Sequence, residues 1–389
     1  MVASGPVVSE QKRPVVALVS DAIYPYFCGG KELRYYELAR RLAANATVDV
    51  YTMHWWEGPR RHTDGAVTFH AISRLRPMYV GNRRSFPEAI FFALGCLRLL
   101  WCHFDALDAD QFPHFHVLTL RLVTWIKRKP LSVTWHEVWE KSYWREYLGW
   151  AGYLAWAFEW LVLHLPDNII AASPQTAARL RVVLGPQASI TVAPNGIDLE
   201  AICSSYPDAA PTDLIVVGRL IEHKRVGMLL DALALLHAEG LPITCRVIGD
   251  GPERLALHER ARTLGVDHAV DFRHDVREQK DIYSLMKAAK IAVFPTAREG
   301  FGIAALEAIA CGLPVITTSA PDNLARHLVE QSARGVVCEQ SAVAIASAVR
   351  RMLEDLDARA RDGHAQDQSL LAQYSWAAVT GQVAQALQI

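Results

Sequence analysis

Two glutamates, Glu299 and Glu307, stand eight positions apart on either side of a turn that contains two glycines. The apolar run at residues 290–295 predicts a strand before them, and the Ala- and Leu-rich run at residues 303–311 predicts a helix. The N–H groups of residues 300–304 would then lie at the positive end of a helix, where phosphate binds readily. Because carboxylates accept hydrogen bonds from hydroxyls, this pattern predicts a site for a diphosphate flanked by hydroxyl groups, as in a nucleotide sugar.

The segment EGFGIAALEAIACGLPVI, residues 299–316, resembles the Glu-x7-Glu signature of the retaining family 4 glycosyltransferases. Further segments resemble other elements of that family in the same order, namely APNGID at 193–198, VVGRL followed by HKR within 216–225, RVIGDGPER at 246–254 and VDFRHDV at 270–276. The resemblance implies the GT-B fold, in which two Rossmann-like, doubly wound α/β domains face each other across a cleft. It also implies transfer of a sugar from a nucleoside diphosphate.

Chain length and periodicity agree with two α/β domains. A chain of 389 residues exceeds one ordinary hydrophobic core. Short apolar runs alternate with helix-like segments in both halves, which predicts parallel sheets wrapped by helices. The predicted strands are residues 15–20, 47–52, 67–72, 132–135 and 168–172 in the first half and 214–217, 244–248, 269–272, 291–294 and 314–317 in the second.

The expected domains are an acceptor-side domain, residues 1–195, and a donor domain, residues 196–373. In the last segment, Trp376, Val379, Val383 and Leu387 recur at helical spacing, and Ser375 stands where a helix N-cap is expected. This stripe, together with the family resemblance, predicts that residues 374–389 form a helix that crosses back to the first domain.

The family resemblance implies roles for four residues of the donor domain. Arg219 and Lys224 would neutralise the departing diphosphate together with the helix N-terminus. Glu299 would bind hydroxyls of the donor sugar and could stabilise an oxocarbenium-like transition state, and Glu307 would bind the ribose hydroxyls. The alternatives are ordinary surface cations for the first two and a solvated carboxylate for Glu307.

Further donor contacts follow from the same resemblance. Gly29 and Gly30, after the first strand, would let the backbone approach the donor, although a tight turn without a ligand is an alternative. His136 resembles the histidine that the family directs at the donor sugar, while a structural role is its alternative; His114 and His116 are poorer candidates. The remaining residues that we expect to bind the donor are Gly218, Arg273, Val276, Gly300, Phe301, Gly302 and Ile303.

The sequence Asp108-Ala-Asp110 has the form of a D-x-D metal motif. It precedes Gln111-Phe-Pro-His rather than a phosphate-binding loop, so we interpret it as a chance match at the end of a strand. We expect no catalytic metal and no cofactor, because cationic residues and a helix dipole can do the work of a metal ion.

Composition limits the partners and the compartment. A net charge of −1 argues against a general attraction to nucleic acid, and 51% hydrophobic residues are typical of a globular protein. The seven cysteines are scattered without C-x-x-C spacing, which favours reduced thiols over disulfides or zinc. No secretory signal opens the chain, so a cytoplasmic location is expected.

Two apolar stretches raise the question of a membrane. Residues 147–165 are nearly long enough to span a bilayer, but Glu159 and His164 interrupt them, which favours a packed helix. Residues 89–101 follow Arg74, Arg76, Arg83 and Arg84. Cations beside exposed aromatic side chains suit a lipid interface, so peripheral contact with the inner face of the membrane stays open beside a solvated loop.

The sequence therefore predicts a retaining, metal-independent hexosyltransferase. It would move a sugar from a nucleoside-diphosphate sugar to a hydroxyl of a glycan, glycolipid or small molecule with an α-linkage. Two alternatives stay open: a sugar-nucleotide epimerase or phosphorylase on the same fold, and a nucleotide-sugar-binding protein without turnover.

Overall fold

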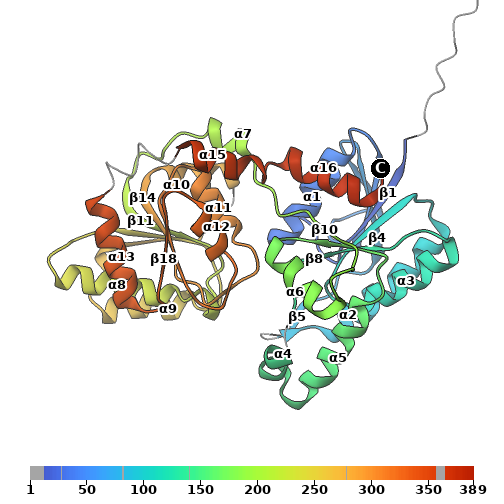
Figure 1. Cartoon of the computed structure of the whole chain (residues 1–389), viewed down its shortest axis with the longest axis horizontal. Helices are drawn as coiled ribbons and strands as arrows, with labels where there is room; N and C mark the ends of the chain where they lie inside the picture. Colours follow the sequence, from blue (N-terminus) through green and yellow to red (C-terminus); the bar gives the residue numbers. More distant parts are fainter. Residues whose placement is uncertain (1–12, 28, 81–82, 140, 277, 356–363) are drawn as a thin grey trace, which may run out of the picture. The chain divides into compact units, whose positions relative to one another are not determined.

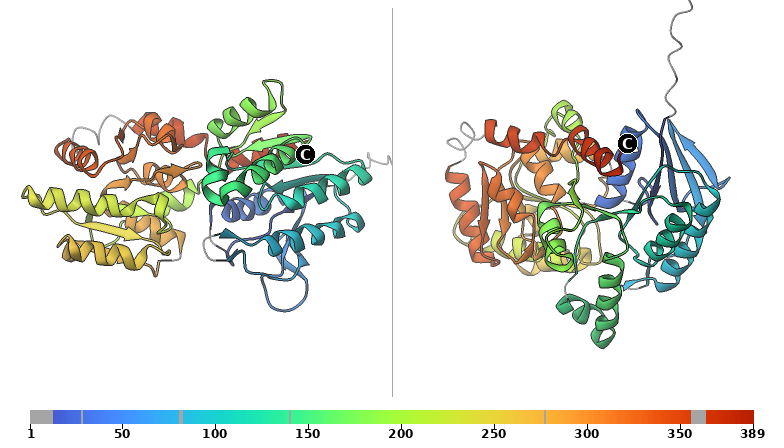
Figure 2. Two further views of the ribbon diagram at one scale, coloured as in Figure 1. Left: turned by 90° about the horizontal axis from the view of Figure 1, so that it is seen from below. Right: turned by 45° about the vertical axis from the view of Figure 1, so that its right-hand side comes forward.

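The computed structural model describes residues 13–389 except residues 28, 81–82, 140, 277 and 356–363. The chain divides into two compact units. The first ends at Pro194 and also contains Thr380–Ile389, and the second is Asn195–Val379. Figures 1 and 2 show that each unit has a central sheet with helices on both of its faces.

The first unit contains an eight-stranded sheet in the order β10-β9-β8-β7-β1-β2-β4-β3. Neighbouring strands are parallel except for the antiparallel β3–β4 hairpin. The strands are β1 (Val15–Val19), β2 (Thr47–Met53), β3 (Arg61–Asp64), β4 (Val67–Ser73), β7 (Ala106–Asp110), β8 (Ser132–Trp135), β9 (Asn168–Ala171) and β10 (Ile190–Val192), and a separate pair is formed by β5 (Tyr79–Val80) and β6 (Arg83–Arg84). All five predicted strands are present, whereas β3, β5, β6, β7 and β10 are additional, and β7 ends with Asp108 and Asp110 at the expected strand end.

The helices of the first unit follow the strands in an α/β order. They are α1 (Gly30–Leu42), α2 (Phe86–Cys96), α3 (Phe115–Lys127), α4 (Lys141–Leu148), α5 (Gly152–Leu163) and α6 (Pro174–Leu184), with short 3-10 turns η1 (Leu97–Trp101) and η2 (Gly149–Ala151). The apolar stretch at residues 147–165 is thus divided between α4, η2 and α5. Among the described residues, no helix is both long enough and apolar enough to cross a membrane.

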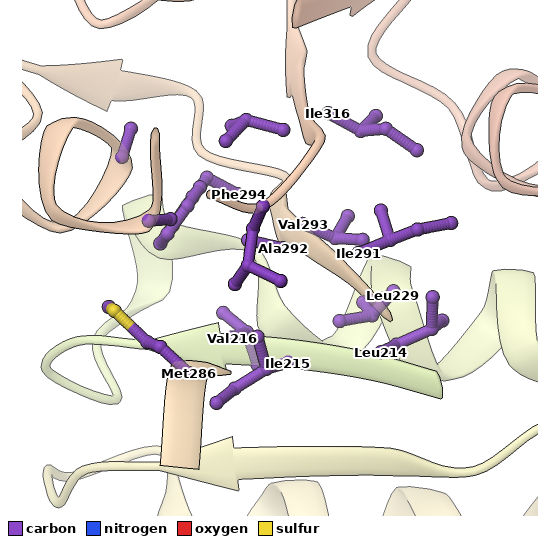
Figure 3. Close-up of a cluster of buried hydrophobic side chains, with 14 of the residues drawn as sticks. Leu214, Ile215, Val216, Leu229, Met286, Ile291, Ala292, Val293, Phe294 and Ile316 are labelled. Atoms are coloured by element: carbon purple, nitrogen blue, oxygen red, sulfur yellow. The ribbon is translucent and has the colours of Figure 1, made fainter. Parts of the chain in front are cut away.

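The second unit contains a six-stranded parallel sheet in the order β13-β12-β11-β14-β16-β18. Its strands are β11 (Thr212–Val217), β12 (Cys245–Ile248), β13 (Val270–Arg273), β14 (Ala289–Phe294), β16 (Val315–Thr318) and β18 (Gly335–Cys338), and β15 (Arg298–Glu299) pairs with β17 (Asp322–Asn323). Adjacent strands contribute Leu214, Val293 and Ile316 to a wholly buried core (Figure 3). All five predicted strands are present, and β15, β17 and β18 are additional.

The helices of the second unit connect these strands. They are α7 (Leu199–Ser204), α8 (Val226–Ala238), α9 (Arg254–Thr263), α10 (Gln279–Lys287), α11 (Ile303–Ala310), α12 (Arg326–Gln331), α13 (Ala342–Glu354) and α15 (His364–Ala372), with 3-10 turns η3 (Glu222–Lys224) and η4 (Asp267–Ala269). The strand order reverses between β11 and β14. In doubly wound sheets, ligands bind at the carboxyl ends of the strands at such a reversal.

The terminal helix α16 (Trp376–Leu387) begins where the sequence predicts it. The hydroxyl of Ser375 accepts a hydrogen bond from the Ala378 N–H at 3.3 Å, as an N-cap does. The stripe Trp376, Val379, Val383 and Leu387 is buried. The division between the two units falls within this helix, after Val379.

Candidate functional site

A hollow in the second unit lies at the reversal between β11 and β14, where doubly wound sheets bind ligands. Its walls come from the end of β11 with the loop that follows, from the end of β14, and from the start of α11. Five predicted site residues line it, namely Gly218, Arg219, Lys224, Glu299 and Gly302. Residues that lie up to 84 positions apart in the sequence are thus gathered around one space.

The central polar feature of this hollow is an ion pair in which Lys224 Nζ donates to Glu299 Oε2. Burial alone would raise the pKa of Glu299, but the Lys224 ammonium and the Phe301 N–H outweigh it and hold this pKa below its usual range. Glu299 is therefore ionised at neutral pH. Arg219 is exposed and forms no ion pair within the described part of the chain.

The N-terminus of α11 opens into the same hollow, because Ala304 and Ala305 line it. The cap residue Gly302 has φ +96°, and a Cβ there would lie 2.4 Å from the Cβ of Ala325. Only glycine fits both the backbone conformation and the space. The uncapped N–H groups of the first turn, with the two cations opposite, make this hollow suitable for an anion such as a diphosphate.

Glu307 lies further along α11, outside the lining of the hollow, and its side chain is 4% exposed. Its Oε1 accepts hydrogen bonds from Gln279 Nε2 at 2.6 Å and from the Tyr283 hydroxyl at 3.1 Å. Burial raises the pKa of Glu307 to about 7, although both donors lower it. Gln279 and Tyr283 were not among the predicted site residues. Their spacing of four on amphipathic α10 places them on one helix face, but nothing local in the sequence links them to Glu307.

The other predicted donor residues of the second unit lie outside the lining of the hollow. Phe301 is buried and packs on Tyr374, with ring centroids 5.6 Å apart. Ile303 and Val276 are half-buried and pack against the hydrophobic core. The guanidinium of Arg273 pairs with Asp275, with 3.0 Å between Nε and Oδ1, and Gly300 is half-buried in the turn before α11.

A buried charged cluster occupies the reversal of the first sheet, between β1 and β7. Lys31 Nζ donates to Asp21 Oδ1 at 2.8 Å and to Asp110, and Arg84 also binds Asp21. Burial would raise the pKa of Asp21, but these two cations outweigh it and hold it below its usual range. Arg84 therefore faces the interior and not a lipid surface.

Gly29 and Gly30 lie at the start of α1, next to Lys31 of this cluster. Gly29 is the N-cap residue in extended conformation, and α1 begins at Gly30. A Cβ on Gly29 would lie 2.4 Å from a carboxylate oxygen of Glu32. This oxygen is the far end of a flexible side chain that can move aside, so the turn itself does not decide between the two alternatives stated above.

His136 follows β8 and is half-buried, with its Nε2 3.7 Å from Asp110 Oδ1. Burial lowers its pKa to about 4, although Asp110 raises it, so the imidazole is neutral at pH 7. Its backbone N–H donates to Gln111 Oε1, and Gln111 Nε2 donates to the Glu137 carbonyl at 2.9 Å. Gln111 thus positions this loop; the sequence gives no sign of this role.

Both candidate metal ligands of the D-x-D motif are wholly buried in the first unit. Asp108 Oδ2 accepts hydrogen bonds at 2.8 Å from the Tyr35 hydroxyl and from the Thr134 hydroxyl, and Asp110 binds Lys31. Burial raises the pKa of Asp108 to about 7. No group of three or more His, Cys, Asp or Glu side chains with a metal-binding arrangement occurs among the described residues.

His114 and His116, the poorer histidine candidates, are buried at the start of α3. Burial lowers the pKa of His114 to about 3 and that of His116 to about 4. A ring nitrogen of His116 lies 2.7 Å from the Asp110 carbonyl oxygen. Their surroundings are those of structural side chains.

Two Rossmann-like units in one chain, with a hollow at a sheet reversal, define a GT-B protein. Comparison with family models agrees with this class. The model for "Glycosyltransferase Family 4" matches residues 28–201, and the model for "Glycosyl transferases group 1" matches residues 206–367. The chain belongs to this family of glycosyltransferases.

Individual relatives extend this comparison. Glycogen synthase of Mycobacterium tuberculosis is 32% identical over 230 residues, which cover 58% of this chain and 55% of the synthase. The GDP-mannose-dependent alpha-(1-6)-phosphatidylinositol dimannoside mannosyltransferase of the same organism is 31% identical over 179 residues, or 44% and 45% of the two chains. The chain thus spans about half the length of these curated relatives.

Among solved structures, sucrose-phosphate synthase from Thermosynechococcus elongatus is similar with a TM-score of 0.79. The similarity covers 97% of this chain and 98% of the synthase, at 22% sequence identity. At this identity the comparison shows a shared fold and does not identify a substrate.

Proposed function

We propose that this chain is a retaining glycosyltransferase that moves a hexose-type sugar from a nucleoside-diphosphate sugar to a hydroxyl acceptor with an α-linkage. The observation that carries the proposal is the hollow of the second unit, where the Lys224–Glu299 pair and the N-terminus of α11 line one space. In this proposal the second unit binds the donor and the first unit binds a saccharide, lipid or small-molecule acceptor. The similar mannosyltransferase, whose name specifies GDP-mannose and an alpha-(1-6) linkage, supports the donor class and the linkage.

The proposed sugar transfer depends on the charged groups and helix N–H groups around the hollow. Negative charge builds on the diphosphate as the bond from the sugar breaks, and preorganised cations and N–H dipoles lower the energy of that state. Arg219, Lys224 and the first turn of α11 supply them. Glu299, ionised beside Lys224, accepts hydrogen bonds from the sugar hydroxyls and favours positive charge on the sugar ring.

Two experiments test this function and separate its alternatives. A thermal-shift panel of UDP, GDP and ADP sugars is expected to give a raised melting temperature with one nucleotide series, because a ligand of the native state stabilises it. With that donor, release of free nucleoside diphosphate should require a hydroxyl acceptor. Binding without acceptor-dependent release would favour a non-catalytic binder, and an epimerised nucleotide sugar without release would favour an epimerase.

We propose that the reaction needs no metal ion and no cofactor. Full transfer activity is therefore expected in the presence of excess EDTA, because Lys224, Arg219 and α11 neutralise the diphosphate. The buried Asp108 and Asp110 are already bound by protein donors. An activity assay before and after chelation measures this. Loss of activity that is restored by adding back a divalent cation would contradict the proposal and would make these two aspartates metal ligands.

Glu307→Gln is expected to change the pH dependence of folding stability. In the folded chain Glu307 keeps its proton up to about pH 7, whereas the unfolded chain releases it near 4.5. The native state is therefore favoured at low pH, and stability should fall as the pH rises through this window, by at most about 3 kcal/mol from this group. Urea unfolding of both proteins across the window measures the difference, and identical slopes would show that the carboxyl is not perturbed.

The same variant tests the proposed ribose contact. An ionised carboxylate is the better acceptor for ribose hydroxyls, so nucleoside diphosphate affinity of the unmodified protein should increase across this pH window and exceed that of Glu307→Gln by about tenfold at its upper end. The phosphates also titrate near this range, but equally for both proteins, so the ratio of their Kd values isolates Glu307. A ratio near one at every pH, measured by calorimetry, would remove this role.

We further propose that the protein acts in the cytoplasm, in contact with the inner face of the membrane. The six cysteines that the structure describes are free thiols, in agreement with a reducing compartment. One similar protein acts on a phosphatidylinositol dimannoside, according to its name, and such an acceptor is a lipid.

A further inference from the structure

Two helices of the first unit, α2 and α3, pack along each other, and α5 contacts the start of α3 (Figure 1). Phe115 of α3 contacts Phe86 of α2 and Phe158 of α5, with ring centroids 6.4 Å and 4.8 Å apart. The connections β4→β7, β7→β8 and β8→β9 all step in the same direction across the sheet. Right-handed crossovers therefore place these helices on the same face of the sheet.

The sides of α2 and α3 that point away from the sheet are apolar. On α2, Phe86, Ile90 and Leu94 are exposed at intervals of four residues, so they form one row. On α3, Leu122 is exposed and Trp125 is 72% exposed. Surface helices of globular proteins normally carry charged and polar residues on the side that points away from the core.

On α5 the large apolar side chains are exposed and the charged side chain is buried, which is the reverse of the usual arrangement on a surface helix. Leu154, Trp156 and Trp160 are exposed, whereas its one charged residue, Glu159, is 2% exposed. Glu159 accepts hydrogen bonds from Trp144 Nε1 at 2.5 Å and from the Trp139 N–H at 3.2 Å. The other acid on these three helices, Glu88 of α2, is also buried. Their outward sides therefore carry no acidic residue.

Cations accompany this apolar face, which we call the α2–α3–α5 face. The guanidinium of Arg76 lies 3.7 Å from the ring centroid of Phe91 on α2. Lys141 Nζ lies 5.0 Å and 5.3 Å from the ring centroids of Tyr153 and Trp156 on α5. The long side chains of these cations cover aromatic surface and keep their charges at its edge.

We propose that the α2–α3–α5 face docks on an anionic lipid bilayer. Tryptophan and phenylalanine side chains suit the boundary between headgroups and acyl chains, and cations beside them attract anionic headgroups. A second copy of the chain is a poorer occupant, because a two-fold interface would bring this acid-free, cationic face against itself. This proposal names the surface that would make the membrane contact of the proposed function, and it rests on that function for the location of the protein at the membrane. Docking itself does not require sugar transfer.

Flotation of the full chain with vesicles tests the proposal. The protein is expected to float with vesicles of phosphatidylcholine and phosphatidylglycerol, and much less with phosphatidylcholine alone. Raised salt should weaken binding to the anionic vesicles because it screens headgroup attraction. Absence of flotation with anionic vesicles at low salt would overturn the proposal.

Matched variants locate the face. The double variant Leu122→Ser, Trp125→Ser removes exposed apolar surface from α3 and should lower the vesicle partition coefficient at least about tenfold without lowering the melting temperature. The control Leu255→Ser, Val343→Ser removes exposed apolar side chains from α9 and α13 of the second unit and should bind vesicles normally. Equal partition of the two double variants would overturn the assignment of this face.

Two further measurements separate this inference from its rivals. If the face joins two copies, light scattering would show a dimer that the α3 variant converts to a monomer, with no vesicle binding, and the lipid proposal would fail. Nucleoside diphosphate binding to the α3 variant should be unchanged, because the hollow of the second unit is untouched. If the α3 variant loses vesicle binding but binds the nucleotide normally, the effect is confined to this face. If the unmodified protein does not bind the nucleotide, the proposed function fails, whatever the result with vesicles.

Discussion

Lys224→Met is expected to slow glycosyl transfer by roughly a hundredfold or more, the usual effect of removing one preorganised electrostatic group. Methionine keeps most of the length of the side chain but removes the charge that would meet the departing diphosphate. It also leaves Glu299, whose pKa Lys224 holds below its usual range, without its partner beside the diphosphate. Both effects act on the transition state, so kcat should fall more than KM rises.

Steady-state kinetics with the donor found by thermal shift measure this effect. Arg262→Met is a matched control, because Arg262 is a largely exposed cation at the end of α9, outside the hollow. The control should behave as the unmodified protein, and Arg219→Ala should change the rate in the same direction as Lys224→Met. If Lys224→Met keeps a near-normal rate, the diphosphate binds elsewhere.

Glu299→Gln is expected to lose most turnover while it binds free nucleoside diphosphate within a few-fold of the normal affinity. Glutamine has the same size but lacks the negative charge that favours positive charge on the sugar ring, and free nucleoside diphosphate has no sugar at that position. The substitution also releases Lys224 from its ion pair. Each partner is about a quarter exposed, so water can solvate the ammonium and the fold should survive.

Calorimetry with the nucleoside diphosphate and single-turnover kinetics with the donor separate these effects. Glu222→Gln, an exposed acid on the same 3-10 turn as Lys224, is the control for a general change of charge. Parallel loss of nucleotide affinity in Glu299→Gln and Glu307→Gln would show that the two glutamates do not divide the donor between sugar and ribose.

The predictable part of the fold is the part that local sequence determines. Compact apolar runs such as β1 and residues 214–217 of β11 were predicted because their residues alone indicate a buried strand. Asp108 and Asp110 were expected at a strand end, but the bounds of β7 were not predicted because these carboxylates interrupt its apolar pattern. Tyr35, Thr134 and Lys31 bind these carboxylates, and they come from distant segments. The hydrogen bonds and the ion pair that stabilise these buried carboxylates form only after the chain has folded.

The same distinction applies to the site. Gly302, Glu299 and α11 form one short motif, so their local arrangement could be predicted. Lys224 came from the family resemblance, and its ion pair with Glu299 joins positions 75 residues apart. Gln111 and Tyr283 had no local signal, because each acts on a segment that is distant in the sequence. The assignment of Phe301 and Val276 to the donor stays a prediction; their apolar side chains pack into the protein, so a donor contact there would involve the backbone.

The inward position of Glu159 has a consequence for kinetics. Its carboxylate holds the Trp139 N–H, and the Trp139 indole N–H donates to the Glu137 carboxylate at 3.0 Å, one residue from His136. The α5 helix is therefore tied by hydrogen bonds to the loop that carries His136. If α5 rests on a bilayer and the acceptor is a lipid in that bilayer, the rate of glycosyl transfer should depend on the mole fraction of acceptor within the bilayer rather than on its bulk concentration. Adding inert lipid at constant total acceptor would then slow the reaction by surface dilution.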